Sequence, residues 1–255
     1  MDFVSYFKQL YSGEGVLRKH LLLFAVAGIM ALLLNNVASS YTNTLLSDSI
    51  TIAPMSVQEI IIDFAFGGIL WLHIFGYEYK FLSNIMNDKP ITLPEFDSEV
   101  FITFCRMLPM FFVWQLYFVF VFYMTLSYTI SSKSLLYYFL IGSLMLFVTP
   151  FVFMIYVKFS KDFKYSTEIL EPWHIAKYID KGLVDVVIWS VKFASYALIP
   201  AAFMVGYMDW AINITLPIPR LVAYLIGLCA GSYIFIIFKL IYGIGMANIV
   251  KEKIS

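Results

Sequence analysis

Three titratable side chains lie inside long apolar stretches of the chain, and they are the residues best placed to do chemistry. Asp63, His73 and Lys192 each fall within a run long enough to cross a lipid bilayer, which takes about 20 helical residues. An ionisable group is costly to place in lipid, so such a residue is a candidate for binding or moving an ion. Each of the three therefore marks a candidate site.

The first candidate site is a polar layer that joins Asp63 to Asn35 and Asn36. At a rise of about 1.5 Å per residue, the two asparagines reach a depth in the first run similar to that of Asp63 in the second. Such a layer could coordinate a cation or carry a proton during transport. It could also simply join two helices by hydrogen bonds, with Asp63 reaching the outer interface beside Glu59.

The second candidate site is an anion pocket between His73 and Lys192, which lie at comparable depths. Asp185 and Trp189 are spaced to share the helical face of Lys192. The pocket would suit a lipid phosphate or a carboxylate substrate. The alternative is that Lys192 extends to the inner surface or pairs with another helix.

The histidines give little support to catalysis, a metal site or a cofactor. His20, His73 and His174 are far apart, and none has a paired metal-ligand spacing. The sequence contains no nucleophile elbow, phosphate loop or zinc motif. An enzyme could use only His174 with Glu171 and Asp180, and an amphipathic surface helix explains that cluster better. We therefore expect a protein that is not an enzyme and needs no cofactor.

The composition is that of a membrane protein. Hydrophobic residues make up 61% of the 255 residues, and charged residues make up 13%, where soluble domains have about a quarter. The net charge of zero removes any global electrostatic argument for binding nucleic acid. Cys105 and Cys229 fall in or beside apolar runs and are expected to be packed thiols without a disulfide.

The apolar runs predict a single all-α membrane domain, residues 1–255, with six transmembrane helices. The runs are continuous and do not alternate, which excludes membrane strands. Apolar residues between positions 2 and 11 form one helical stripe, which predicts a short surface helix closed by Gly13 and Gly15. The predicted spans are about 20–40, 56–78, 107–130, 134–157, 183–208 and 221–248.

The distribution of Lys and Arg predicts the orientation. Of the 17 Lys and Arg, Lys133 and Arg220 lie in loops on one side, Lys192 lies within a span, and all the others lie on the side of the two termini. Cytoplasmic loops are enriched in Lys and Arg, so both termini are expected in the cytoplasm.

The two larger cytoplasmic loops resemble each other, which suggests a parallel repeat of residues 56–130 and 134–208. In each, an aromatic residue follows a lysine, Lys80 or Lys158, and a proline stands fourteen residues after that lysine. Proline and carboxylates suit the first turn of a helix, so each loop is expected to start an amphipathic interfacial helix. The motif residues are Leu93, Pro94, Glu95, Phe96 and Asp97 in the first loop, and Glu171, Pro172 and Trp173 in the second.

Gly76-Tyr77 at the end of a span, followed by the motif at 93–97, resembles a family of bacterial and archaeal membrane proteins known only as a domain of unknown function. More distantly, the layout of residues 15–250 resembles the membrane domain attached to some glycerophosphodiester phosphodiesterases. The chain departs from the family after Asp97, where Ser98-Glu99-Val100 replaces the usual Trp and Gly. The resemblance implies a six-span protein of a prokaryotic cytoplasmic membrane without an established activity.

Small residues recur every four positions in the last span, at Ala223, Gly227 and Gly231. This spacing lets a second helix approach closely, either from the same chain or across a homodimer.

Two functions follow from these residues. The first is a non-enzymatic membrane component, such as a scaffold or an assembly partner, which contacts the lipid bilayer and a protein partner or a second copy. The alternative is a transporter or permease subunit with Asp63 and Lys192 in its pathway.

Overall fold

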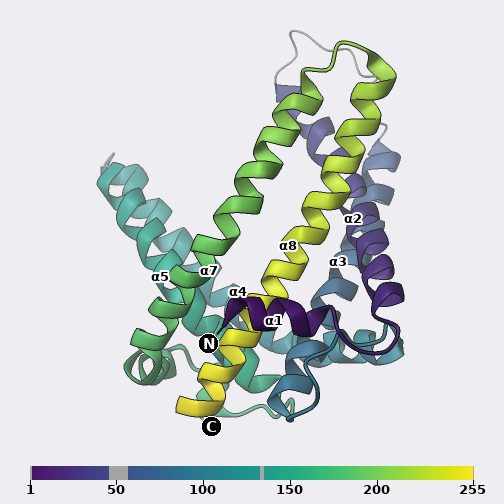
Figure 1. Ribbon diagram of the computed structural model, residues 1–255. Coiled ribbons are helices and arrows are strands. Elements are labelled where there is room, and N and C mark those ends of the chain that lie inside the picture. Colours follow the sequence, from purple (N-terminus) through teal and green to yellow (C-terminus); the bar gives the residue numbers. More distant parts are fainter. Residues whose placement is uncertain (1, 46–56, 133–134, 255) are drawn as a thin grey trace.

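The chain folds into a bundle of long helices in a computed structural model that describes residues 2–45, 57–132 and 135–254 (Figure 1). No strand occurs among these residues, which confirms the predicted all-α class. The helices are α1 (Phe3–Leu10), α2 (Val16–Leu45), α3 (Val57–Met86), α4 (Ser98–Ser132), α5 (Leu135–Phe159), α6 (Thr167–Leu170), the 3-10 helix η1 (Pro172–His174), α7 (Ile175–Ile212) and α8 (Pro217–Lys253).

Five of these helices are long and apolar enough to cross a membrane, which fits an integral membrane protein. They are α2, α3, α4, α7 and α8. Among the described side chains of α5, the apolar stretch is shorter, Phe147–Phe159.

Several helices run past their predicted spans at the end of the bundle that holds both chain termini, which we call the basal end (Figure 1). Helix α3 continues to Met86, and α4 already begins at Ser98. Charged residues lower the mean hydropathy of these segments, but buried apolar residues between them keep the helices packed. In α3, for example, Phe81 and Leu82 are fully buried just after Lys80.

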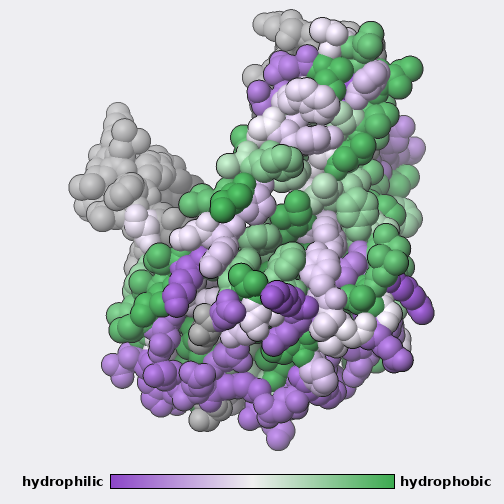
Figure 2. Space-filling model, viewed as in Figure 1, coloured by the Kyte–Doolittle hydropathy of each residue, from purple (hydrophilic) through white to green (hydrophobic). Residues whose placement is uncertain are grey.

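The basal end also holds most of the core. The largest fully buried side chains include Trp189, Tyr77, Tyr178, Phe81 and Phe151, all in basal segments of α3, α5 and α7. Toward the opposite, apical end, large apolar side chains stay exposed along the helices (Figure 2). A surface of this kind suits contact with lipid, whereas the basal surface is polar.

Helices α4 and α5 lean away from the other long helices as they leave the basal end (Figure 1). They rejoin the bundle basally, where Phe151, Ile155 and Phe159 of α5 are fully buried. Gly182 of α7 allows this packing, because an added Cβ would lie 3.0 Å from Cε of Met154.

The first basal loop differs from the prediction that each loop begins a proline-initiated helix. Residues 87–97 contain no helix, and α4 begins at Ser98, so Pro94 lies outside its first turn. The helix start is set instead by Asp97, whose carboxylate accepts a hydrogen bond from the Glu99 amide at 3.0 Å. In the second loop, Pro172 is indeed the first residue of η1.

The predicted N-terminal helix is confirmed as α1. Gly13 and Gly15, with φ of +102° and +64°, turn the chain between α1 and α2.

Candidate functional site

Seven charged residues tie the helices together near the basal end, and we call them the ion-pair belt. Its most buried member is Glu78 of α3, whose side chain is 4% exposed and lies 2.6 Å (Oε2 to Nζ) from Lys239 of α8. A buried carboxylate without a partner is strongly unfavourable, so this contact fixes α3 against α8. The belt consists of Lys19, Glu78, Lys80, Glu95, Asp97, Glu99 and Lys239.

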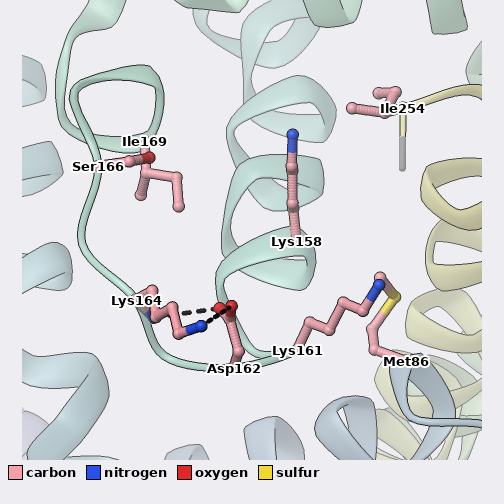
Figure 3. Close-up of a pocket in the computed structure, with 8 residues that line it drawn as sticks. All are labelled: Met86, Lys158, Lys161, Asp162, Lys164, Ser166, Ile169 and Ile254. Carbon is pink, nitrogen blue, oxygen red and sulfur yellow. Dashed lines mark hydrogen bonds and ion pairs between the residues drawn. The ribbon is translucent and has the colours of Figure 1, made fainter.

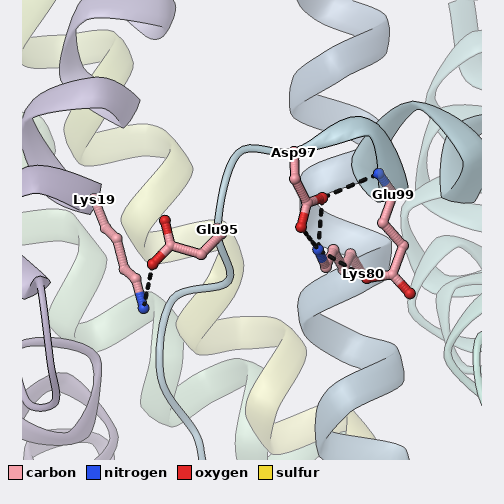
Figure 4. Close-up of polar contacts among 5 residues, drawn as sticks. All are labelled: Lys19, Lys80, Glu95, Asp97 and Glu99. Atoms are coloured by element: carbon pink, nitrogen blue, oxygen red, sulfur yellow. Dashed lines mark hydrogen bonds and ion pairs between the residues drawn. The ribbon is translucent and has the colours of Figure 1, made fainter.

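Lys80 contacts two carboxylates of the belt at once (Figure 4). Its ammonium donates to both oxygens of Asp97 at 2.7 Å and lies 3.0 Å from Glu99. The hydrogen bonds from Lys80 hold the pKa of the Asp97 carboxyl below its usual value. Since Asp97 also caps α4, the same carboxylate joins the end of α3 to the start of α4.

Gly76-Tyr77 and the motif at 93–97 both have structural roles in this region. Gly76 allows α4 to approach, because a Cβ there would lie 2.3 Å from the carbonyl oxygen of Val100. Tyr77 stacks on Phe96, with ring centroids 4.3 Å apart. Leu93 is buried in the core.

Glu95 extends the motif to a further helix. Its carboxylate lies 3.3 Å from Lys19 of α2 (Figure 4). The motif residues therefore fasten α2, α3 and α4 to one another.

A second polar chain connects α1, α2 and α8. His20 Nε2 lies 3.1 Å from the Leu10 carbonyl oxygen, and its Nδ1 lies 2.6 Å from the Tyr233 hydroxyl. A carbonyl can only accept, so in the neutral ring Nε2 donates to Leu10 and Nδ1 accepts from Tyr233. Tyr11 lies 2.8 Å from the same hydroxyl, which anchors α1 across the bundle.

Of the three residues in the predicted polar layer, the structure describes the side chains of Asn35 and Asp63. Asn35 accepts a hydrogen bond from the Tyr224 hydroxyl of α8 at 3.0 Å, so its described partner is on α8. Asp63 is half-buried on α3. The side chain of Asn36 lies outside the described residues.

The residues of the predicted anion pocket differ in their burial and in their contact partners. Lys192 is exposed on α7, whereas Trp189 is fully buried and donates to the Tyr242 carbonyl at 3.1 Å. Asp185 pairs with Lys253 at 3.4 Å. His73 donates through Nδ1 to the Ile69 carbonyl of its own helix at 2.9 Å, and its ring lies 5.9 Å from that of Phe101 on α4.

The stripe of small residues in α8 packs against α7 of the same chain. A Cβ added to Gly227 would lie 2.4 Å from Sδ of Met208, and one added to Gly231 would lie 3.2 Å from Cε of Met204. The carbonyl of Ala223 accepts from the Tyr207 hydroxyl at 3.1 Å. Of the two alternatives for this stripe, the structure therefore places an intramolecular neighbour against it.

The second motif forms a small exposed cluster in the loop between α5 and α7. His174 Nε2 lies 3.0 Å from Glu171 Oε2, next to Pro172 at the start of η1. Trp173 is 66% exposed. Within the described part of the chain, no group of three or more His, Cys, Asp or Glu side chains is arranged to hold a metal ion.

Sequence reasoning assigned Glu78, Lys80 and Lys239 no role as a site. Lys239 entered it only among the charges that mark the cytoplasmic side, and Lys80 entered it both among those charges and as the starting point of the loop repeat. The signal that could have found them is the continuation of the last helix through Lys239, which places a lysine on a helix face that must pack.

Comparison with protein-family models, curated proteins and solved structures finds no match to this chain. The resemblance based on residues 76–97 therefore stays a prediction, and the functional argument depends on the geometry alone.

Proposed function

We propose that this protein is a non-enzymatic component of a membrane complex, with six transmembrane helices and both termini in the cytoplasm. Its basal end would then be a rigid cytoplasmic platform on which a protein partner docks. The observation that carries this proposal is the contrast between a packed basal end, closed by the ion-pair belt, and the exposed apolar side chains of the apical halves.

Helix length and charge support the six-span topology. Helix α5 has 25 residues, enough at about 1.5 Å each to cross a hydrocarbon core of roughly 30 Å. Most Lys and Arg, including those of the belt, lie in basal segments, in agreement with the positive-inside rule.

Helix α1 supports a membrane boundary at the level of the belt. It is amphipathic, as expected for a helix at a lipid surface, and its Phe3 stacks on Tyr196 of α7 at 4.4 Å. Along α8 its contacts run from Tyr233, which Tyr11 reaches, to Asn248, which donates to the Tyr6 hydroxyl at 2.7 Å. Lys239 of the belt lies within that stretch, so the basal loops and helix ends beyond it would lie in the cytoplasm.

The transport alternative receives less support from the geometry. Two of its pathway candidates make described hydrogen bonds that form no common site: Asn35 accepts from Tyr224 of α8, and His73 donates to Ile69 of its own helix. The belt charges are already paired with one another, as expected for groups that stabilise a fixed structure.

The test is the intact mass of the protein extracted in native lipid discs that keep partners bound. We expect a stoichiometric partner, which Trp173→Ala should release because an exposed tryptophan is a typical anchor residue. Trp210→Ala is the matched control, since Trp210 is 58% exposed near the apical end of α7. A lone chain or a homodimer in the wild type would contradict the proposal and favour flux assays of Asp63→Asn and Lys192→Ala.

A further inference from the structure

Three lysines line a cavity of about 390 Å³ at the basal end, apart from the ion-pair belt (Figure 3). They come from the end of α5 and the loop after it. Lys158 projects between Ser166 and Ile169 on one side and Ile254 on the other (Figure 3). The lining residues are Met86, Lys158, Lys161, Asp162, Lys164, Ser166, Ile169 and Ile254.

The backbone that carries these lysines is held in place at both ends. The Asn87 side chain donates to the carbonyl oxygen of Lys161 at 2.8 Å. The Tyr165 hydroxyl donates to the carbonyl oxygen of Arg106 at 2.6 Å. Phe159, just before this segment, is fully buried. The backbone that carries the lysines is therefore already ordered, which lowers the entropy lost when a ligand binds.

The same segment contains a strained residue. Phe163 has a φ of +55°, a conformation that bulky side chains rarely adopt. Its ring packs against Phe159 at 5.7 Å and beneath the Arg106 guanidinium at 5.6 Å. Such strain persists where the surrounding structure requires it, commonly at a ligand site.

The charges and walls of the cavity define the chemistry of a ligand. Two of the three lysines have described neighbours: Lys164 lies 3.7 Å from Asp162, and the Lys158 ammonium lies 5.9 Å from the centroid of the Tyr178 ring. Among the lining residues lysines outnumber carboxylates, and Ser166 adds a hydroxyl donor. Met86, Ile169 and Ile254 form an apolar wall beside it.

We propose that this lysine cavity binds a phosphate group. Lysine ammonium groups bind phosphate through charge-assisted hydrogen bonds, and the apolar wall suits the organic part of a phosphate ester. The ester could be the headgroup of an anionic lipid at the cytoplasmic membrane surface or a soluble phosphorylated compound. Binding here requires no protein partner, so it can be tested separately from the proposed function.

The experiment uses the purified full chain in two arms. In the lipid arm, native mass spectrometry counts phosphatidylglycerol retained from discs that mix it with phosphatidylcholine. In the soluble arm, inorganic phosphate is titrated into protein in phosphatidylcholine discs and followed by the shift in unfolding temperature. The test variant is Lys161→Gln with Lys164→Gln, and the matched control is Lys89→Gln with Lys181→Gln, two exposed basal lysines outside the cavity.

We expect the test variant to weaken binding at least about tenfold in one arm, because two charge-assisted hydrogen bonds are lost, while the control changes it less than about twofold. The arm that responds identifies the source of the phosphate. Lys161→Arg with Lys164→Arg should retain most of the binding, which separates lost charge from a folding defect. Equal losses in test and control variants, or no saturable binding in either arm, would overturn the proposal.

Discussion

Replacing Gly245 of α8 with alanine should destabilise the basal core. An added Cβ would lie 2.1 Å from Cε2 and 2.3 Å from Nε1 of the Trp189 indole. Real Cβ atoms do not approach other atoms this closely, so the ring or the helix must move. The ring has little room, because Trp189 is 1% exposed and its Nε1 donates to the Tyr242 carbonyl.

Three contributions set the magnitude. Overpacking a filled core costs about 1–3 kcal/mol. Displacing the indole also weakens a hydrogen bond that contributes about 0.5–1.5 kcal/mol. Alanine regains about 0.5–1 kcal/mol relative to glycine within a helix. At the midpoints of these ranges the net loss is about 2 kcal/mol, which corresponds to a fall in unfolding temperature of about 4–8 °C for a chain of this size.

The assay is the unfolding temperature of the protein in one detergent, followed by tryptophan fluorescence and by the loss of the monodisperse chromatographic peak. Gly206→Ala is the control, because a Cβ at this helical position meets nothing within 4 Å. Adding Trp189→Phe to Gly245→Ala should recover part of the loss, since the smaller ring leaves space. An unchanged or raised unfolding temperature for Gly245→Ala would refute the packing argument.

Four further variants test the belt and the helix packing. Lys239→Met should lower the free energy of unfolding by about 3–5 kcal/mol, because it leaves the buried Glu78 carboxylate unpaired. Glu78→Gln should lower it by only about 1 kcal/mol, because Lys239 is 43% exposed and can reach water. Thermal unfolding of the two variants compares these values. Asp97→Asn should lower stability at pH 7 by less than about 2 kcal/mol and by a smaller amount near pH 3, as measured by unfolding at both values. Gly227→Leu should lower the unfolding temperature by overpacking α7 while leaving the oligomeric mass unchanged.

The pH dependence at Asp97 follows from the sign of its shift. Its pKa in the folded protein is lowered by the Lys80 hydrogen bond, so its contribution is complete above the unfolded value of about 3.9 and is lost as the pH falls through the folded value. An equal loss at pH 3 and pH 7 would contradict the ion pair. A larger cost for Glu78→Gln than for Lys239→Met would contradict the assignment of the buried partner. A dimer-to-monomer change in Gly227→Leu would contradict the intramolecular packing.

The helices were predictable because hydropathy reports them directly. A run such as 134–157 contains no charge, and only a helix satisfies its backbone in lipid. The basal extensions were not predictable in the same way. In 77–86 of α3, the charged residues Glu78 and Lys80 are buried among apolar residues, so the mean hydropathy falls although the helix continues and stays packed.

The candidate site was predicted less well than the fold. Placing an ionisable residue in lipid has a high free-energy cost, and Asp63 and Lys192 were predicted as site residues for this reason. Burial in the folded chain, however, depends on which face a helix turns to its neighbours, and a single span does not reveal this. Lys192 proves exposed, while Glu78, whose position near a span end carries no such signal, is buried.

The motif at 93–97 illustrates the same limit. Its residue types predicted a helix start, and a helix start is present, but it depends on Asp97 rather than on Pro94. Asp97 also joins α4 to α3 through its ion pair with Lys80, which lies 17 positions earlier in the sequence. Only the turn of the intervening loop brings the two residues together.

Both proposals depend on one claim, that the basal end lies on the cytoplasmic side, outside the bilayer. Single cysteines placed in a chain without Cys105 and Cys229 test it most directly, by labelling with a membrane-impermeant maleimide in intact and permeabilised cells. The account predicts that Asn213→Cys is labelled in intact cells, that Lys181→Cys is labelled only after permeabilisation, and that the lipid-facing Ile199→Cys is labelled in neither. Labelling of Lys181→Cys in intact cells, or its protection in both conditions, would contradict it.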